Sequence, residues 1–193
     1  MIPFVVSPSA SLRRALSNHI HASTSSDCQT ACTQFNNEVN AFVAENPSIR
    51  TVIIARLWGG CDSLDRAINL INQLVEQGKK VIVVGPVPFL AFNVPERWIY
   101  QQLKAGQAID SMTNPITSQQ HLFDLQRLAQ KQLSALLASG RVVWIAPLQK
   151  LCNKTDCLLV EKGVSYFKDV THLSEVGAML FTEDFAWALG NRL

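Results

Sequence analysis

Apolar residues along the chain alternate between short continuous runs and segments with helical spacing. Continuous runs rich in β-branched residues, as expected for strands buried on both faces, occur at 2–6, 50–58, 79–88 and 141–147. Apolar side chains three or four positions apart predict helices over 33–46, 64–77 and 118–138, and a last helix that begins near Ser174. Strands separated by helices predict an α/β fold with three layers, in which a doubly wound parallel sheet has helices on both faces.

The connections between these elements indicate one domain over residues 1–193. Asp62 or Ser63 can cap the helix at 64–77, and Gly78 follows its end, as is common where helices stop. No internal repeat and no low-complexity linker interrupts the sequence. The connection at 89–116 is long for a compact α/β domain, and long loops of this kind often serve a functional site.

Composition excludes two classes of protein. The chain has 193 residues, 48% of them hydrophobic, which is enough to bury one substantial core. Its 17 basic and 15 acidic residues are scattered, whereas a nucleic-acid surface needs clustered Lys and Arg, so we expect no nucleic-acid partner. The longest apolar stretches fall short of the roughly 20 residues of a membrane-spanning helix.

The five cysteines allow three interpretations. Cys152 and Cys157 bracket a short polar loop, "CNKTDC", and Cys28 and Cys32 bracket "CQTAC", so two local disulfides with Cys61 left over would indicate an oxidising compartment. Five free thiols in a reducing compartment are the second interpretation. The third is a zinc site formed by His19, His21, Cys28 and Cys32, although these pairs lack the usual zinc-finger spacing.

The stretch "YFKDVTHLSEVGAMLF" places Asp169 three residues before His172, ahead of the predicted last helix. In open parallel sheets the ligand site lies beyond the carboxyl ends of the strands, and this segment follows the last predicted strand. A neutral histidine accepts a proton near pH 7, and a carboxylate bound to its other ring nitrogen fixes its tautomer. The pattern therefore makes Asp169 and His172 candidate catalytic residues, while a capped turn with an ordinary histidine is the structural alternative.

The same stretch resembles the C-terminal block of SGNH-type hydrolases and acyltransferases. It is most similar to the extracytoplasmic SGNH domain fused to acyltransferase-3 membrane proteins that O-acetylate surface polysaccharides. The pattern D-x-x-H-L-S-x-x-G-A is typical of that family, and this chain has it from Asp169 to Ala178. Three further blocks resemble the family in order: "CTQFNNEVNAFVAENPSIRTVIIARLW", "GKKVIVVGPVPF" and the paired-cysteine loop "LCNKTDC".

The resemblance implies a flavodoxin-like SGNH fold and a Ser-His-Asp triad that includes His172 and Asp169. It implies acyl transfer or ester hydrolysis on a glycan or acyl-ester substrate, such as O-acetylation or deacetylation of a cell-surface polysaccharide. It also implies a periplasmic domain tethered to the inner membrane through a fused or partner acyltransferase-3 domain, and a Cys152–Cys157 disulfide. We expect neither a cofactor nor a metal.

The sequence departs from the family pattern at the motif that carries the catalytic nucleophile. The family has Gly-Asp-Ser at the end of its first strand, and no "GDS" occurs here. Ser9 and Ser7 follow the strand-like run at 2–6, which is a suitable context for a nucleophile turn. Ser63 also follows a strand, but matches a later strand of the family. We favour a fourth interpretation, in which the chain is N-terminally truncated and lacks the first strand.

The sequence also leaves several candidates for the groups that bind the oxyanion. The stretch "ARLWGG" offers the Arg56 guanidinium, the Trp58 indole N–H and the backbone N–H groups of Gly59 and Gly60 at the end of a strand. The alternative is that Trp58 belongs to the core and Arg56 to a surface ion pair. Since the nucleophile block is missing, a catalytically degenerate glycan-binding or regulatory domain is the alternative to an enzyme.

Overall fold

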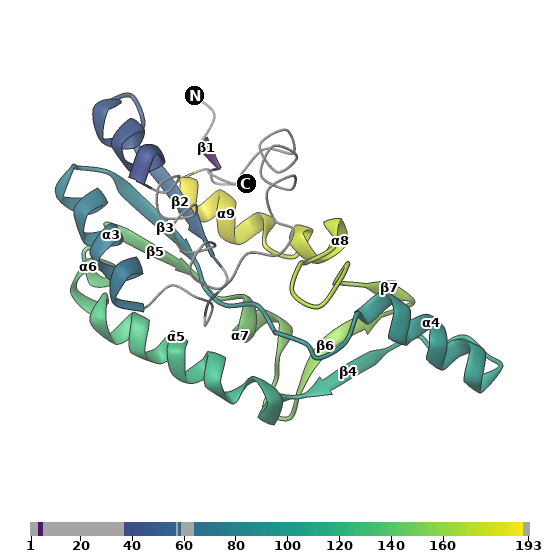
Figure 1. Ribbon diagram of the computed structural model, residues 1–193. Helices are drawn as coiled ribbons and strands as arrows, with labels where there is room; N and C mark the ends of the chain where they lie inside the picture. The colour runs from purple at the N-terminus through teal and green to yellow at the C-terminus, as the bar shows by residue number, and fades with distance from the viewer. Residues whose placement is uncertain (1–3, 6–36, 57, 59–63, 191–193) are drawn as a thin grey trace, which may run out of the picture.

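The computed structural model describes residues 4–5, 37–56, 58 and 64–190, and its main sheet is parallel throughout (Figure 1). The strand order in this sheet is β1 (Phe4–Val5), β2 (Thr51–Ala55), β3 (Lys80–Val84) and β5 (Val142–Ile145). The predicted strands at 50–58, 79–88 and 141–147 are confirmed, each shorter than its apolar run. The fold class is therefore the predicted doubly wound α/β fold.

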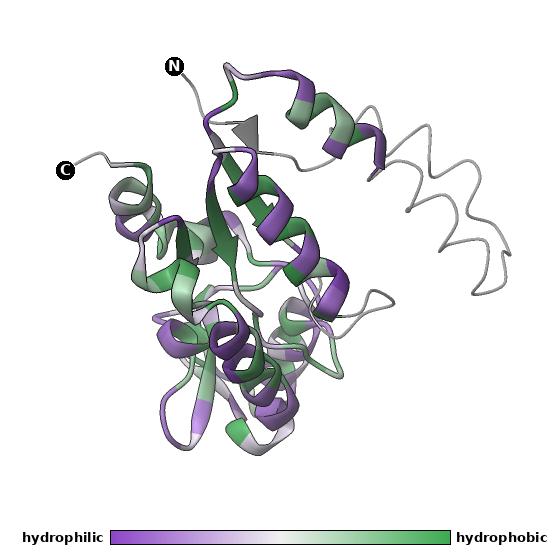
Figure 2. Cartoon of the chain, turned by 90° about the vertical axis from the view of Figure 1, so that its left-hand side faces the viewer, coloured by the Kyte–Doolittle hydropathy of each residue, from purple (hydrophilic) through white to green (hydrophobic). Residues whose placement is uncertain are grey.

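Alternate residues of β3 face two separate cores. Val81 and Val83 pack into one core, while Ile82 packs into the other. Such alternation follows from the strand geometry, and both faces are apolar because both are covered. The strands appear as a green hydrophobic layer between helices that are purple where they face outward (Figure 2).

Helices cover the two faces of this sheet. The core around Val81 and Val83 is closed by α3 (Leu64–Glu76), α5 (Gln120–Gln132) and α6 (Ser134–Ala138). The core around Ile82 receives buried residues of α9 (Thr182–Leu189) and of a second, smaller sheet. These three layers match the architecture expected from the sequence.

The strand β1 lies beside β2, with Phe4 opposite Val52 and Val5 opposite Ile53. In a doubly wound sheet of order 2-1-3-4-5, the first strand adjoins the third. The described order β1-β2-β3-β5 therefore corresponds to positions 1, 3, 4 and 5 of such a sheet. Residues 4–5 occupy the position that would be vacant if the first strand were missing.

A second sheet was not predicted from the sequence. It is antiparallel and contains β4 (Met112–Pro115), β6 (Asp156–Glu161) and β7 (Val164–Ser165). The strands β4 and β7 are too short for a period of two to be visible, and β4 ends in proline. The predicted connection at 89–116 thus contains β4 and also α4 (Val94–Ala105), a helix capped by the Asn93 side chain.

Two predicted helices are divided in the structure. The segment at 118–138 contains the end of η1 (Ile116–Gln119), then α5 and α6; the last helix consists of α8 (Glu175–Met179) and α9. A short helix, α7 (Pro147–Leu151), follows β5. The helix described at 37–45 lies within the predicted helix at 33–46; it buries Val43, whereas Phe42 is 54% exposed. No helix of the described residues has both the length and the apolar content needed to cross a membrane.

Candidate active site

The Asp169 carboxylate organises the turn that leads from β7 to α8. Its Oδ1 accepts hydrogen bonds from the backbone N–H groups of Thr171, at 2.9 Å, and His172, at 2.8 Å. Its Oδ2 lies 2.8 Å from Nδ1 of the His172 ring. The backbone N–H of Lys168 donates to the His172 carbonyl at 2.9 Å and closes the turn. The predicted hydrogen bond between Asp169 and His172 is confirmed.

The electrostatics of this pair favour an ionised carboxylate. Burial raises the pKa of Asp169, but hydrogen bonds from the backbone of Thr171 and His172 and from the His172 ring outweigh it. Together they lower the pKa of Asp169 from 3.8 to about 2. An ionised carboxylate can only accept, so Nδ1 of His172 carries the proton and Nε2 of the neutral ring has a free lone pair. The His172 side chain is 59% exposed, and the described part of the chain gives Nε2 no hydrogen-bond partner.

The turn is attached to the carboxyl end of the parallel sheet. The backbone N–H of Leu90, six residues after the last residue of β3, donates to the carbonyl of Val170 at 3.0 Å. Val170 lies within the turn, directly after Asp169. The segment that leaves β3 therefore holds the Asp169–His172 pair on the side of the sheet where ligand sites of this fold lie.

The rest of the motif fixes the turn to its neighbours. Ser174 caps α8, because its Oγ accepts from the Gly177 N–H at 3.0 Å, and the same hydroxyl donates to the Ser165 carbonyl at 2.7 Å. A Cβ on Gly177 would lie 2.1 Å from the carbonyl oxygen of Tyr166, so only glycine fits there. The motif therefore combines two residues with candidate chemistry and two that position them.

The candidate oxyanion residue Trp58 lies in the core. Its side chain is 5% exposed, its ring packs against Trp144 with centroids 5.3 Å apart, and its indole N–H donates to the Val84 carbonyl at 2.9 Å. An N–H already bound to the Val84 carbonyl is not available to an oxyanion, so the geometry supports the core interpretation of Trp58. The Arg56 guanidinium lies 5.3 Å from the centre of the Trp58 ring.

Arg56 also lines a cavity of about 340 Å³ between the helix at 37–45 and α3. Asn40 of the helix at 37–45 and Arg66 and Asn69 of α3 also line it. Neither Asp169 nor His172 lines it. The Asp169–His172 pair therefore contributes nothing to this cavity.

Several candidates from the sequence fall outside the described residues. These are Ser7, Ser9, Gly59, Gly60 and Ser63. The proposed zinc ligands His19, His21, Cys28 and Cys32 fall outside them as well. Within residues 37–56, 58 and 64–190, no three His, Cys, Asp or Glu side chains gather as a metal-ligand set.

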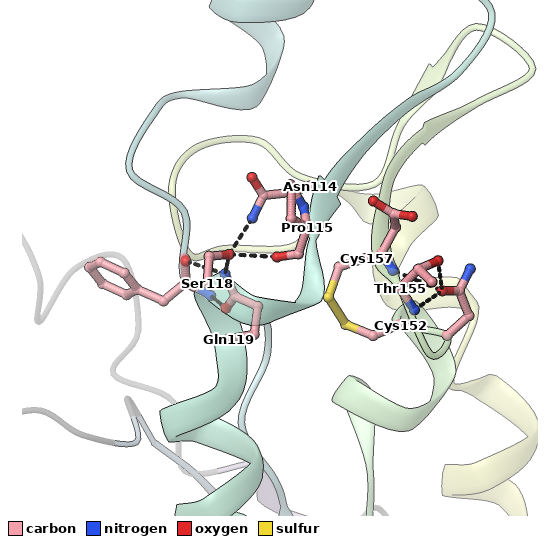
Figure 3. The surroundings of a disulfide bond; sticks show 10 residues. Asn114, Pro115, Ser118, Gln119, Cys152, Thr155 and Cys157 are labelled. Carbon is pink, nitrogen blue, oxygen red and sulfur yellow. Dashed lines mark hydrogen bonds between the residues drawn. A yellow bond between two sulfur atoms is a disulfide. The ribbon is translucent and has the colours of Figure 1, made fainter.

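The disulfide between Cys152 and Cys157 is present in the structure, with a sulfur separation of 2.05 Å. It joins the end of α7 to β6, and Cys157 is fully buried. Figure 3 shows it beside Asn114 and Ser118 of the neighbouring segment.

Gln119, also labelled in Figure 3, was not singled out from the sequence, because a glutamine near the start of a helix gives no signal of burial.

A doubly wound sheet with a carboxylate-bound histidine ahead of the last helices agrees with the resemblance to SGNH-type hydrolases and acyltransferases. The family described as "SGNH domain (fused to AT3 domains)" matches residues 10–186, and the chain belongs to this family. The family description names AT3 domains as the fused partner.

A solved structure shows the same fold. It is the lipopolysaccharide acetyltransferase periplasmic domain of Salmonella ser. Paratyphi A, with a TM-score of 0.53 and 18% sequence identity. The match covers 81% of this chain and 62% of that chain, so this chain spans less than two thirds of the solved domain. No curated protein sequence matches this chain.

Proposed function

We propose that this chain is the periplasmic acyl-transfer or ester-hydrolysis domain of a system that O-acetylates or deacetylates a cell-surface polysaccharide. The observation that carries the proposal is the 2.8 Å bond between His172 Nδ1 and Asp169 Oδ2, together with the exposed His172 ring. Membership of a family fused to AT3 domains supports a membrane acyltransferase-3 domain as its partner, in the same polypeptide or in another, and hence tethering to the inner membrane.

In the proposed first step, a serine Oγ attacks the carbonyl carbon of the acyl donor while Nε2 of His172 takes the hydroxyl proton. Asp169 holds the ring in the required tautomer and stabilises the imidazolium. The tetrahedral intermediate then collapses, and the leaving oxygen takes the proton from Nε2. The products of this step are an acyl-serine and the free alcohol of the donor.

In the proposed second step, a sugar hydroxyl or a water molecule attacks the acyl-serine. Neutral His172 takes the proton of the attacking oxygen and returns it to the departing serine Oγ. A sugar acceptor gives an O-acylated glycan, and water gives the free acid. The same two residues therefore serve transfer and hydrolysis, and the acceptor decides between them.

We propose Ser9 as the serine within this chain. The parallel pairing of β1 with β2 supports this, because a nucleophile turn follows a strand in sequence and Ser9 comes shortly after β1. The truncation that we expected from the sequence stays a prediction. It would place the nucleophile in a Gly-Asp-Ser block encoded upstream of Met1, and sequencing that DNA tests it.

Hydrolysis of p-nitrophenyl acetate by purified single and double variants tests the mechanism. If Ser9 is the nucleophile, Ser9→Ala and His172→Ala should each abolish turnover, and the double variant should be no worse, because such residues act as one unit. Ser7→Ala and Ser63→Ala are the matched serine controls. Strong turnover that is unaffected by every serine and by His172→Ala would contradict the mechanism.

The second candidate is a catalytically degenerate domain that binds a glycan or regulates its partner. The specific observation that favours it is the absence of "GDS" from the sequence. It predicts only trace turnover, unchanged by Ser9→Ala and by His172→Ala, with retained binding of an acetylated polysaccharide in an isothermal titration.

A further inference from the structure

Gln119 binds both backbone polar groups of one residue in the segment after β3. The Phe89 N–H donates to Gln119 Oε1 at 2.8 Å, and Gln119 Nε2 donates to the Phe89 carbonyl at 2.9 Å. The Gln119 side chain is fully buried. A primary amide offers a donor and an acceptor side by side, so it holds the Phe89 backbone as a neighbouring strand would.

The residue after Phe89 carries this constraint to the candidate active site. The Leu90 N–H donates to the Val170 carbonyl at 3.0 Å, and the Leu90 side chain is 2% exposed. Val170 separates Asp169 from Thr171, whose backbone N–H binds the Asp169 carboxylate. The Gln119 side chain is thus linked to the turn that holds His172 through the Phe89 backbone and one backbone hydrogen bond, from Leu90 to Val170.

Gln119 is itself anchored to the second sheet. Its Nε2 also donates to Ser118 Oγ at 2.8 Å, and this oxygen accepts from Asn114 Nδ2 at 2.7 Å and donates to the Pro115 carbonyl at 2.8 Å. Asn114 pairs with Cys157 in the ladder between β4 and β6. Figure 3 shows these contacts beside the disulfide. Both N–H groups of the buried Gln119 amide are used, and a buried amide whose hydrogen bonds are satisfied is held firmly.

We propose that Gln119 is a positioning residue that holds the Asp169–His172 turn at the carboxyl edge of the sheet, through Phe89, Leu90 and Val170. The inference rests on the proposed function for its catalytic meaning, since the turn supplies the proposed base. The mechanical link itself consists of hydrogen bonds that exist whether or not the chain has a nucleophile.

The chain offers a matched control for this inference. Gln126 is a second glutamine, 2% exposed, two turns further along the same helical segment. Its Oε1 is buried without a hydrogen-bond partner among the described residues. Leucine at either position removes a buried amide and keeps the side-chain size, but only Gln119→Leu breaks the bonds to Phe89.

Hydrogen exchange and carboxyl titration by NMR test the inference without any need for activity. In Gln119→Leu we expect the Leu90 amide to exchange about tenfold faster. We also expect the pKa of Asp169 to rise from about 2 toward 3.8, because the Thr171 and His172 N–H groups are held less firmly. In Gln126→Leu both readouts should match the wild type.

Two results would overturn the inference: unchanged Leu90 exchange and Asp169 titration in Gln119→Leu, or equal changes in both variants. If Gln119→Leu does not fold, Ser118→Ala replaces it, since it removes one support of Gln119 and leaves the Phe89 bonds. There the Leu90 amide should exchange two- to threefold faster, and no change would count against the inference. A chain without esterase activity but with these NMR changes would refute the proposed function alone.

Discussion

At the scale of single residues, the Asp169 carboxylate serves the fold and the candidate chemistry together. It accepts two backbone hydrogen bonds that shape the turn and a third from the His172 ring. Hydrogen bonds to the charged form of a carboxyl group stabilise that form in the folded state only. The lowered pKa of Asp169, about 2, therefore links the turn to folding stability.

This link predicts how stability depends on pH. The pKa of Asp169 in the folded state is below the ordinary 3.8. The ionised carboxylate therefore contributes fully to the free energy of unfolding above about pH 4, and this contribution is lost as the pH falls toward 2. Asp169→Asn should unfold at lower urea concentration at pH 7 and lose less stability than the wild type between pH 4 and 2. Urea unfolding at pH values from 2 to 7 measures this.

Asp110→Asn is the control for that experiment, because Asp110 is an exposed carboxylate far along the chain from the turn. It should stay within about 0.5 kcal/mol of the wild type at pH 7. If Asp169→Asn kept the full pH dependence of the wild type between pH 4 and 2, the carboxylate would not be the group that couples the turn to stability.

Gly177 gives a second prediction at this scale. A methyl group there would meet the Tyr166 carbonyl oxygen, which is backbone and already accepts from the Ser174 N–H. Gly177→Ala should therefore lower the free energy of unfolding by at least about 2 kcal/mol, although alanine favours helices. Val176→Ala, at a 45% exposed position of the same helix, should change it by less than about 0.5 kcal/mol. Similar values for the two variants would show that the contact relaxes at little cost.

At the scale of elements, the disulfide braces the junction of α7 and β6. The cysteines are five positions apart, and the bond closes a short loop next to the β4–β6 ladder. Since Asn114 faces Cys157 there and binds Ser118, the brace lies at the outer end of the network that includes Gln119. The second sheet therefore supports the candidate site, although it contributes none of its chemical groups.

Removal of this disulfide should destabilise the fold moderately. For so short a loop, the chain-entropy treatment gives about 2 kcal/mol. The double variant Cys152→Ser/Cys157→Ser should show this loss in urea unfolding, and dithiothreitol should lower the stability of the wild type by about 2 kcal/mol more than that of the variant. A wild type whose unfolding is indifferent to reductant would contradict a stabilising disulfide.

At the scale of the whole molecule, the two cores share the central strand β3. Leu133, 1% exposed, belongs to the core on one face of the sheet, and Leu159, fully buried, belongs to the core on the other. Val81 and Val83 belong to one core and Ile82 belongs to the other, so both cores depend on β3. If β3 unfolds, both cores lose part of their packing. The domain should therefore unfold in one cooperative transition.

Substitutions in the two cores test this cooperativity. Leu133→Ala and Leu159→Ala should each cost about 2–5 kcal/mol. The double variant should equal their sum within about 0.5 kcal/mol, since the side chains lie on opposite faces of the sheet. Urea unfolding followed by circular dichroism and by tryptophan fluorescence should give coincident curves. Two separated transitions in either single variant would contradict one cooperative unit.

The sequence by itself determined the parallel sheet and the Asp169–His172 pair. The runs at 50–58, 79–88 and 141–147 are apolar on both faces, which is a local property of the chain, and their alternation with helices specifies the fold class. The pair could be predicted because both residues belong to one turn, so their contact depends on a spacing of three residues. The cysteine loop at 152–157 was visible for the same reason.

Only the tertiary structure decided which groups meet across the chain. Trp58 donates to Val84, 26 positions away, and Gln119 binds Phe89, 30 positions away. No local pattern records such partners, because burial of a polar side chain depends on the elements packed around it. The second sheet was hidden likewise, since β4 pairs with β6 across more than 40 residues and its four residues carry no periodicity of their own. Local periodicity thus specifies the elements, whereas long-range packing decides which polar groups support the candidate site.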